Sequence, residues 1–111
     1  MAGRATRSSG SMSVNAMLAK IDLRTRIIEE HHLQQSIARD DAFRKEHPDL
    51  WQRADEARIA RNKAQGELNR KLRAAGCKPV MLEPSLRQRV RKLQQLQARN
   101  RAETAKLRAA R

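Results

Sequence analysis

The sequence predicts an all-α protein built from long helices, with a disordered basic tail at its start and a coiled-coil-like helical hairpin at its C-terminus. Three observations support this class. Leu, Ile and Val recur three or four residues apart, which is the period of one helix face. Alanine, the strongest helix former, occurs 17 times. Gly and Pro number only four and three, and beyond residue 13 all but Gly66 stand between the periodic segments.

Residues 1–13, MAGRATRSSGSMS, contain small and basic residues and no acid. Such a segment buries too little apolar surface to offset its ordering entropy, so we expect a disordered basic tail. Its Arg, Ser and lack of acids are also typical of organelle transit peptides. Residues 14–111 are expected to form a single helical domain, because one domain is about all that this length allows.

The first helix is predicted over residues 14–46, where no Gly or Pro interrupts the chain. Five of its residues follow the spacing of a single helix face, namely Val14, Leu18, Ile21, Thr25 and Ile28. Leu23 and Ile27 widen this face. The pattern leaves open whether the stripe pairs within one chain or between chains. Acids slightly outnumber bases here, with seven against five over residues 21–50.

The second helix is predicted over residues 48–75. Pro48 suits the first position of a helix, where its missing N–H is not needed, and Gly76 is a helix-stop signal. The only two aromatic rings of Phe, Tyr or Trp type, Phe43 and Trp51, flank Pro48 and are expected to form a small core plug at this junction.

The third helix is predicted over residues 85–110, with Ser85 as its cap. In the preceding loop we expect Val80, Met81 and Leu82 to tuck under the helix ends. The apolar residues of the last two helices predict a face for a partner or a second copy, because alanine-rich stripes give only thin cores. These residues are Leu86, Val90, Leu93, Leu96, Leu68 and Leu72.

The charge is concentrated at the C-terminus. Lys and Arg number 25 against 12 Asp and Glu, a net charge of +13, and residues 84–111 hold nine bases and one acid, Glu103. A solvated helix face normally mixes both signs, so this bias indicates binding to a polyanion such as a phosphate backbone. The predicted contact residues are Arg87, Arg91, Lys92, Arg99, Arg101, Lys106 and Arg108.

Other classes of function lack their motifs. The sequence has no glycine-rich phosphate loop, nucleophile elbow or paired carboxylates, so we expect no enzyme activity, no cofactor and no small-molecule substrate. The half-motif Glu29-Glu30-His31-His32 has no second copy, so we expect no metal site. No apolar run approaches the ~18 residues of a membrane span. A lone Cys77 fits a reducing, intracellular compartment.

Two hypotheses remain. The first is a non-enzymatic protein that binds DNA or RNA through its backbone, without strong sequence specificity, because zinc ligands and a helix-turn-helix signature are missing and base-stacking aromatics are few. The alternative is a small structural or adaptor subunit of a large assembly, such as a ribosomal particle or a virus particle, held by helix–helix contacts. Both hypotheses explain the same excess of positive charge, and both allow a protein partner or a homo-oligomer.

Overall fold

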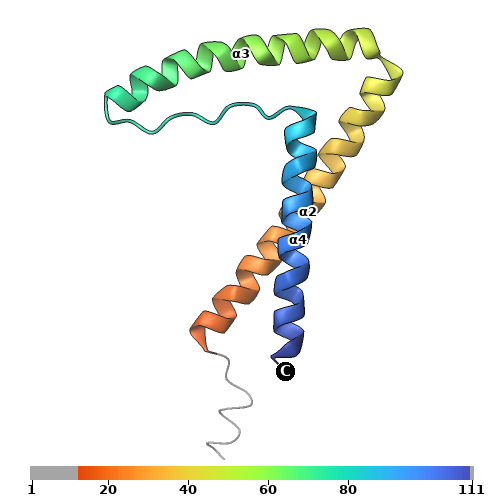
Figure 1. Ribbon diagram of the computed structural model, residues 1–111, viewed down its shortest axis with the longest axis vertical. Helices are drawn as coiled ribbons and strands as arrows, with labels where there is room; N and C mark the ends of the chain where they lie inside the picture. The colour runs from red at the N-terminus through yellow and green to blue at the C-terminus, as the bar shows by residue number, and fades with distance from the viewer. Residues whose placement is uncertain (1–12, 111) are drawn as a thin grey trace, which may run out of the picture. The chain divides into compact units, whose positions relative to one another are not determined.

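The computed structural model describes residues 13–110, and every regular element in that range is an α-helix (Figure 1). Helix α2 spans Val14–Glu46, α3 spans Pro48–Ala74 and α4 spans Leu86–Ala109. The all-α class is therefore confirmed. The predicted basic tail lies outside the described residues except for Ser13. Its hydroxyl accepts a hydrogen bond from the Ala16 N–H at 3.1 Å, so Ser13 is the N-cap of α2 rather than the end of a tail.

Helix α3 begins and ends at the predicted signals. Pro48 occupies its first turn, where the negative charge of Asp49 also interacts favourably with the positive end of the helix dipole. At the other end Gly76 adopts φ 76°, in the left-handed region that favours glycine. The Cys77 N–H donates to the Leu72 carbonyl at 2.8 Å and the Gly76 N–H to the Arg73 carbonyl at 3.0 Å. These two bonds form a Schellman motif, which satisfies carbonyls that the helix end would otherwise leave unpaired.

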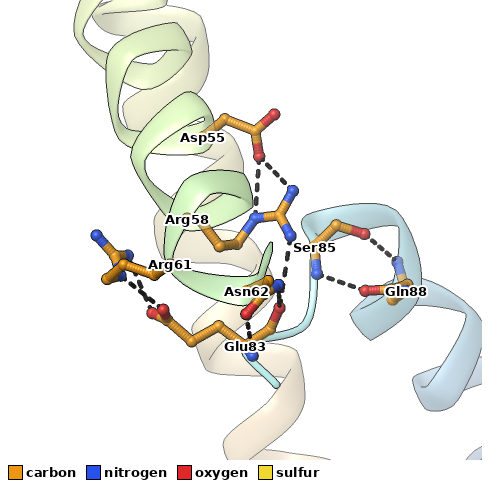
Figure 2. A network of polar contacts seen from close by, with 7 residues as sticks. All are labelled: Asp55, Arg58, Arg61, Asn62, Glu83, Ser85 and Gln88. Atoms are coloured by element: carbon orange, nitrogen blue, oxygen red, sulfur yellow. Dashed lines mark hydrogen bonds and ion pairs between the residues drawn. The ribbon is translucent and has the colours of Figure 1, made fainter. Parts of the chain in front are cut away.

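Helix α4 begins with a capping box, drawn in Figure 2. The Gln88 N–H donates to the Ser85 hydroxyl at 3.1 Å, and the Ser85 N–H donates to the Gln88 side-chain oxygen at 2.8 Å. Two N–H groups at the helix start are thereby satisfied reciprocally. The predicted cap at Ser85 is confirmed.

The chain divides into two compact units. Within the described range, unit 1 comprises residues 13–33 and 93–110, and unit 2 comprises residues 34–92. In unit 1, α2 and α4 pack antiparallel, because Glu30 contacts Asn100 and the earlier Arg26 contacts the later Glu103. Leu23 is the one apolar side chain that is buried among the described residues, so this core is small and its centre is largely polar.

Unit 2 is organised by α3 and the linker of residues 75–85, which runs back along the helix (Figure 1). Asn69 binds the backbone of Val80, accepting from its N–H at 2.9 Å and donating to its carbonyl at 2.8 Å. Asn62 binds Glu83 in the same two-pronged way, at 2.9 and 2.8 Å. We call this arrangement the asparagine ladder.

The spacing of the ladder has a simple geometric origin. Asn62 and Asn69 are seven residues apart, so they lie on one face of α3 about 10.5 Å apart along the axis. Val80 and Glu83 are three extended residues apart, which spans about 10 Å. The helix and the linker are therefore in register over both contacts, with their directions opposed.

The ladder overturns the expectation that the linker's apolar side chains tuck under the helix ends. Val80, Met81 and Leu82 are all exposed, and Met81 retains 88 % of its accessible surface. The physical reason is that α3 holds the linker by its backbone, so these side chains are left to face outward.

Two further contacts of unit 2 join α2 to the start of α4. Arg89 donates to the Ser36 hydroxyl at 2.7 Å and forms an ion pair with Asp40 at 2.6 Å. The predicted C-terminal hairpin is present as the order α3, linker, α4. That its two helices pack in a coiled-coil-like way stays a prediction.

The expected aromatic plug at the α2–α3 junction is not formed. Phe43 is exposed and its ring lies 5.1 Å from that of His47. Trp51 is half-buried and lines a cavity of about 330 Å³ together with Ala54, Arg58 and Leu86. The two rings therefore lie in different surroundings, Phe43 beside His47 and Trp51 beside Leu86.

Candidate nucleic-acid interface

The seven cations predicted to contact phosphate all lie exposed on α4. Arg87, Arg91 and Lys92 belong to unit 2. The other four belong to unit 1 and are Arg99, Arg101, Lys106 and Arg108. Each unit thus presents its own set of cations to solvent.

Their exposure follows from the period of α4. The side chains that pack toward the interior recur every three or four residues, which leaves the positions between them outside. The half-buried or buried residues of α4 are Leu86, Arg89, Leu93, Leu96, Gln97, Asn100, Glu103, Thr104 and Leu107. Of the predicted partner face, Leu86, Leu93, Leu96 and Leu72 are half-buried, whereas Val90 and Leu68 are exposed.

Not every base of this region is available to a ligand. Arg89 is turned inward onto Asp40 and Ser36, and its side chain is only 15 % exposed. Its role is therefore to hold α4 against α2 within unit 2. The sequence alone gives Arg89 the same weight as Arg87 or Arg91, because all three belong to one basic run.

The single acid of α4 is already neutralised. Glu103 forms ion pairs with Arg26 of α2 and with Arg99 of α4, the latter at 3.3 Å. Its carboxylate is therefore compensated by two guanidinium groups. Because both partners lie beside it, Glu103 adds little repulsion toward an approaching phosphate.

Two open grooves flank α4 in unit 1. One of about 620 Å³ has Arg101 and Arg108 at its edge and Glu30 beside them. The other, of about 360 Å³, has Arg99 and Lys106 at its edge, with Asp22 of α2 among its lining residues. Acids from α2 therefore reach both grooves. Among the exposed cations of α4, Arg99 is itself paired with an acid, Glu103, at 3.3 Å.

Helix α3 carries exposed bases that were not among the predicted contacts. By helical period, Arg53, Lys63, Arg70 and Lys71 lie on the side away from the linker. Glu56 and Glu67 lie among them on the same side. The excess of bases in residues 51–83 could have drawn attention to this surface, but its mixed signs are typical of a solvated helix face.

Other cations are used in local ion pairs. Arg61 binds Glu83 at 2.6 and 3.0 Å (Figure 2), which holds the pKa of that carboxyl below its ordinary value and raises the pKa of the guanidinium. Hydrogen bonds from Arg44, and then from Lys45, lower the pKa of Asp41. These pairs explain why much of the positive charge outside α4 is compensated where it stands.

Within residues 13–110, no group of three or more His, Cys, Asp or Glu side chains could hold a metal ion, and the rings of His31 and His32 stand 6.4 Å apart. None of the three helices combines the length and the apolar character needed to cross a bilayer.

Comparison with known proteins gives no relative: no protein-family model, no curated protein and no solved structure matches the chain. The function must therefore be argued from the chain's own residues.

Proposed function

We propose that this protein binds the phosphate backbone of nucleic acid, without strong sequence specificity, through the exposed cations of α4. The observation that carries the proposal is the set of seven exposed Arg and Lys side chains on a helix whose only acid, Glu103, is half-buried and paired. Each phosphate neutralised by such a side chain releases condensed counterions, which is the main source of non-specific affinity.

The chemistry of this surface favours backbone contact over base readout. Arg and Lys side chains on a solvated helix reach phosphate oxygens readily. Stacking on bases needs aromatic rings, and Phe43 and Trp51 both lie outside α4. We therefore expect similar affinity for duplexes of unrelated sequence.

The test is a salt titration of binding to short duplex DNA and duplex RNA of arbitrary sequence, followed by fluorescence anisotropy. The variant replaces Arg87, Arg91 and Arg101 by Gln. Because each phosphate contact contributes about 0.9 to the slope of log K against log salt, the slope should fall by about 3.

The matched control replaces three exposed arginines of α3, Arg53, Arg70 and Arg73, by Gln. This variant loses the same charge but keeps all the cations of α4. It should therefore lower the slope by less than 1. Equal losses in the two variants would mean that net charge alone matters and would contradict a specific role for α4. Binding that does not change with salt would contradict the proposal as a whole.

One observation favours the alternative, a structural or adaptor subunit of a larger particle. The described residues contain one buried apolar side chain, Leu23, and many large apolar side chains that are exposed. Such a chain has little hydrophobic free energy to stabilise it alone. Cooperative melting of the purified chain, with nucleic-acid binding on its own, supports the first function. A chain that folds only when a partner protein is added supports the second.

A further inference from the structure

A cavity of about 330 Å³ lies within unit 2, where α2, α3, the end of the linker and the start of α4 meet. Its volume is at the lower end of the range for small-molecule sites in proteins, about 300–1,000 Å³. Trp51, the only tryptophan of the chain, is half-buried and lines this cavity. The seven cations proposed to contact phosphate are not part of the lining, so the cavity is a separate site.

The space beside the indole ring has a local cause on α3. Positions 51, 54, 55 and 58 lie on one face of that helix, because residues three and four apart are neighbours on a helix surface. Ala54 has only a methyl group and therefore leaves room next to Trp51. Pro84 and Leu86 add further apolar atoms to the lining. One part of the wall is thus aromatic and aliphatic.

The rest of the wall is charged but neutralised in pairs. Three ion pairs account for it, namely Arg58 with Asp55 at 2.9 Å, Arg61 with Glu83 at 2.6 Å (Figure 2) and Arg89 with Asp40 at 2.6 Å. A phosphate group would meet three carboxylates here beside three guanidinium groups, so the net charge of the lining does not favour an anion. An uncharged ring with polar edges loses nothing in such surroundings.

A nucleobase has the shape and the polarity that this wall accommodates. Its face stacks on aromatic side chains and on planar guanidinium groups. Its edge carries both donors and acceptors, and the paired guanidinium and carboxylate groups of the wall supply both kinds of partner. Because every base has these features, the cavity does not select one base over the others.

We propose that this cavity binds one unpaired base of a single-stranded nucleic acid, stacked on Trp51. Arg87 directly follows the lining residue Leu86, and Arg91 lies about one turn further along α4, with both side chains exposed. These two cations are placed to contact the phosphates beside the bound base. The inference rests on the proposed function, since the same cations hold the strand. A base inside a duplex is paired and stacked, so only a single strand gains this contact.

The first experiment uses the native, nuclease-treated chain. Because Trp51 is the only tryptophan, its fluorescence reports directly on the proposed site. A short single-stranded DNA of arbitrary sequence is compared with three probes: its duplex, an abasic strand with the same number of phosphates, and a nucleoside monophosphate. We expect the single strand to quench the emission in step with its binding, and the duplex and the abasic strand to bind without quenching. The monophosphate should not quench at these concentrations, because it lacks neighbouring phosphates.

The second experiment measures affinity by fluorescence anisotropy of labelled strands. Trp51→Leu should weaken binding of the single strand about tenfold, the factor that corresponds to one stacked base. Its affinity for duplex should stay within about twofold, because the phosphate contacts of α4 are retained. Trp51→Phe keeps an aromatic ring and should restore most of the single-strand affinity. The control Phe43→Leu removes the other aromatic ring, which is exposed and outside the cavity lining, and should change neither affinity.

Three results would overturn the inference: no quenching by the single strand, equal quenching by the duplex or the abasic strand, or equal losses in Trp51→Leu and Phe43→Leu. Quenching by the monophosphate at the same concentrations would indicate a site for free nucleotides and would contradict the assignment to a strand. The first experiment needs no variant, so it decides the question if Trp51→Leu does not fold.

The two proposals fail in different ways. If the cavity does not bind a base, duplex binding keeps its dependence on salt and on the α4 cations, and only the preference for single strands disappears. If α4 does not bind phosphate, the salt titration of duplex binding shows it without reference to Trp51.

Discussion

Two asparagines are the most buried polar residues among residues 13–110, and they differ in how fully their side-chain amides are hydrogen-bonded. Asn69 in unit 2 and Asn100 in unit 1 are each 4 % exposed. Asn69 accepts hydrogen bonds from Gln65 and from the Val80 N–H, and it donates to the Val80 carbonyl. Asn100 donates to Glu30 at 3.1 Å, while its buried Oδ1 has no partner.

The difference shows that burial of a polar side chain does not by itself indicate stabilisation. A buried amide that meets backbone donors and acceptors fixes the path of a segment, because no apolar residue can replace those bonds. A buried amide with an unpaired oxygen loses hydration free energy, and its remaining hydrogen bond offsets this loss only in part. We therefore expect substitutions at the two positions to change stability in opposite directions.

The largest effect is expected for Asn69→Leu. The replacement is similar in size but removes both bonds to Val80, so the linker should detach locally at a cost of about 3 kcal/mol. Hydrogen exchange of the Val80 amide should accelerate about 100-fold. Unchanged protection of that amide would show that the ladder does not hold the linker.

A smaller effect is expected for Asn62→Ala. Asn62 is only half-buried, and Glu83 is held in addition by Arg61 through its carboxylate. The loss should be about 1 kcal/mol, which accelerates exchange of the Glu83 amide about fivefold. The Val80 amide serves as the internal control, and an equal change there would mean that the two contacts act as one unit.

Asn100→Leu should change stability by about 1 kcal/mol in the opposite direction. It removes the unpaired Oδ1 and adds apolar contact between α2 and α4, at the loss of one hydrogen bond to the partly solvated Glu30. Protection of the Thr104 amide should rise. The contrasting variant Asn100→Asp brings a second carboxylate beside Glu30 and should lower that protection. A destabilised Asn100→Leu would mean that the two asparagines are alike.

The smallest effect concerns pH. Arg61 lowers the pKa of Glu83 in the folded chain, so the ion pair stabilises unit 2 above the carboxyl's ordinary pKa. This stabilisation should be lost as the pH falls through the folded-state pKa. Comparing the melting temperature of the native chain with that of Glu83→Gln across the acid range checks the sign: the difference should be greatest near neutral pH and vanish in acid.

Much of the local structure could be predicted because its causes are local. Pro48, Gly76 and Ser85 begin or end helices through backbone sterics and nearby hydrogen bonds, and each stands where the sequence predicts. The exposure of the seven α4 cations also follows from helical period. Such effects reach only a few residues along the chain, so a single sequence contains them.

Contacts distant in sequence could not be predicted. The pattern ranks Arg89 with its basic neighbours, yet Asp40 lies 49 positions earlier and turns it inward. Likewise, Asn62 and Asn69 have ordinary helix positions until the linker lies against them. Their partners are backbone groups, which every residue has, so no residue type marks the contact in advance.

The sequence by itself determined that this chain is helical, where its helices start and stop, and that its positive charge gathers in residues 84–111. Only the tertiary structure decided which face of α2 is covered. Periodicity predicts the apolar face that contains Val14, Leu18 and Ile21, which is exposed, whereas the covered face is that of Leu23, Arg26 and Glu30. The covered face of α2 is the one where Arg26 and Glu30 contact polar partners on α4. The physical reason is that buried polar groups must be paired, whereas apolar groups can remain exposed.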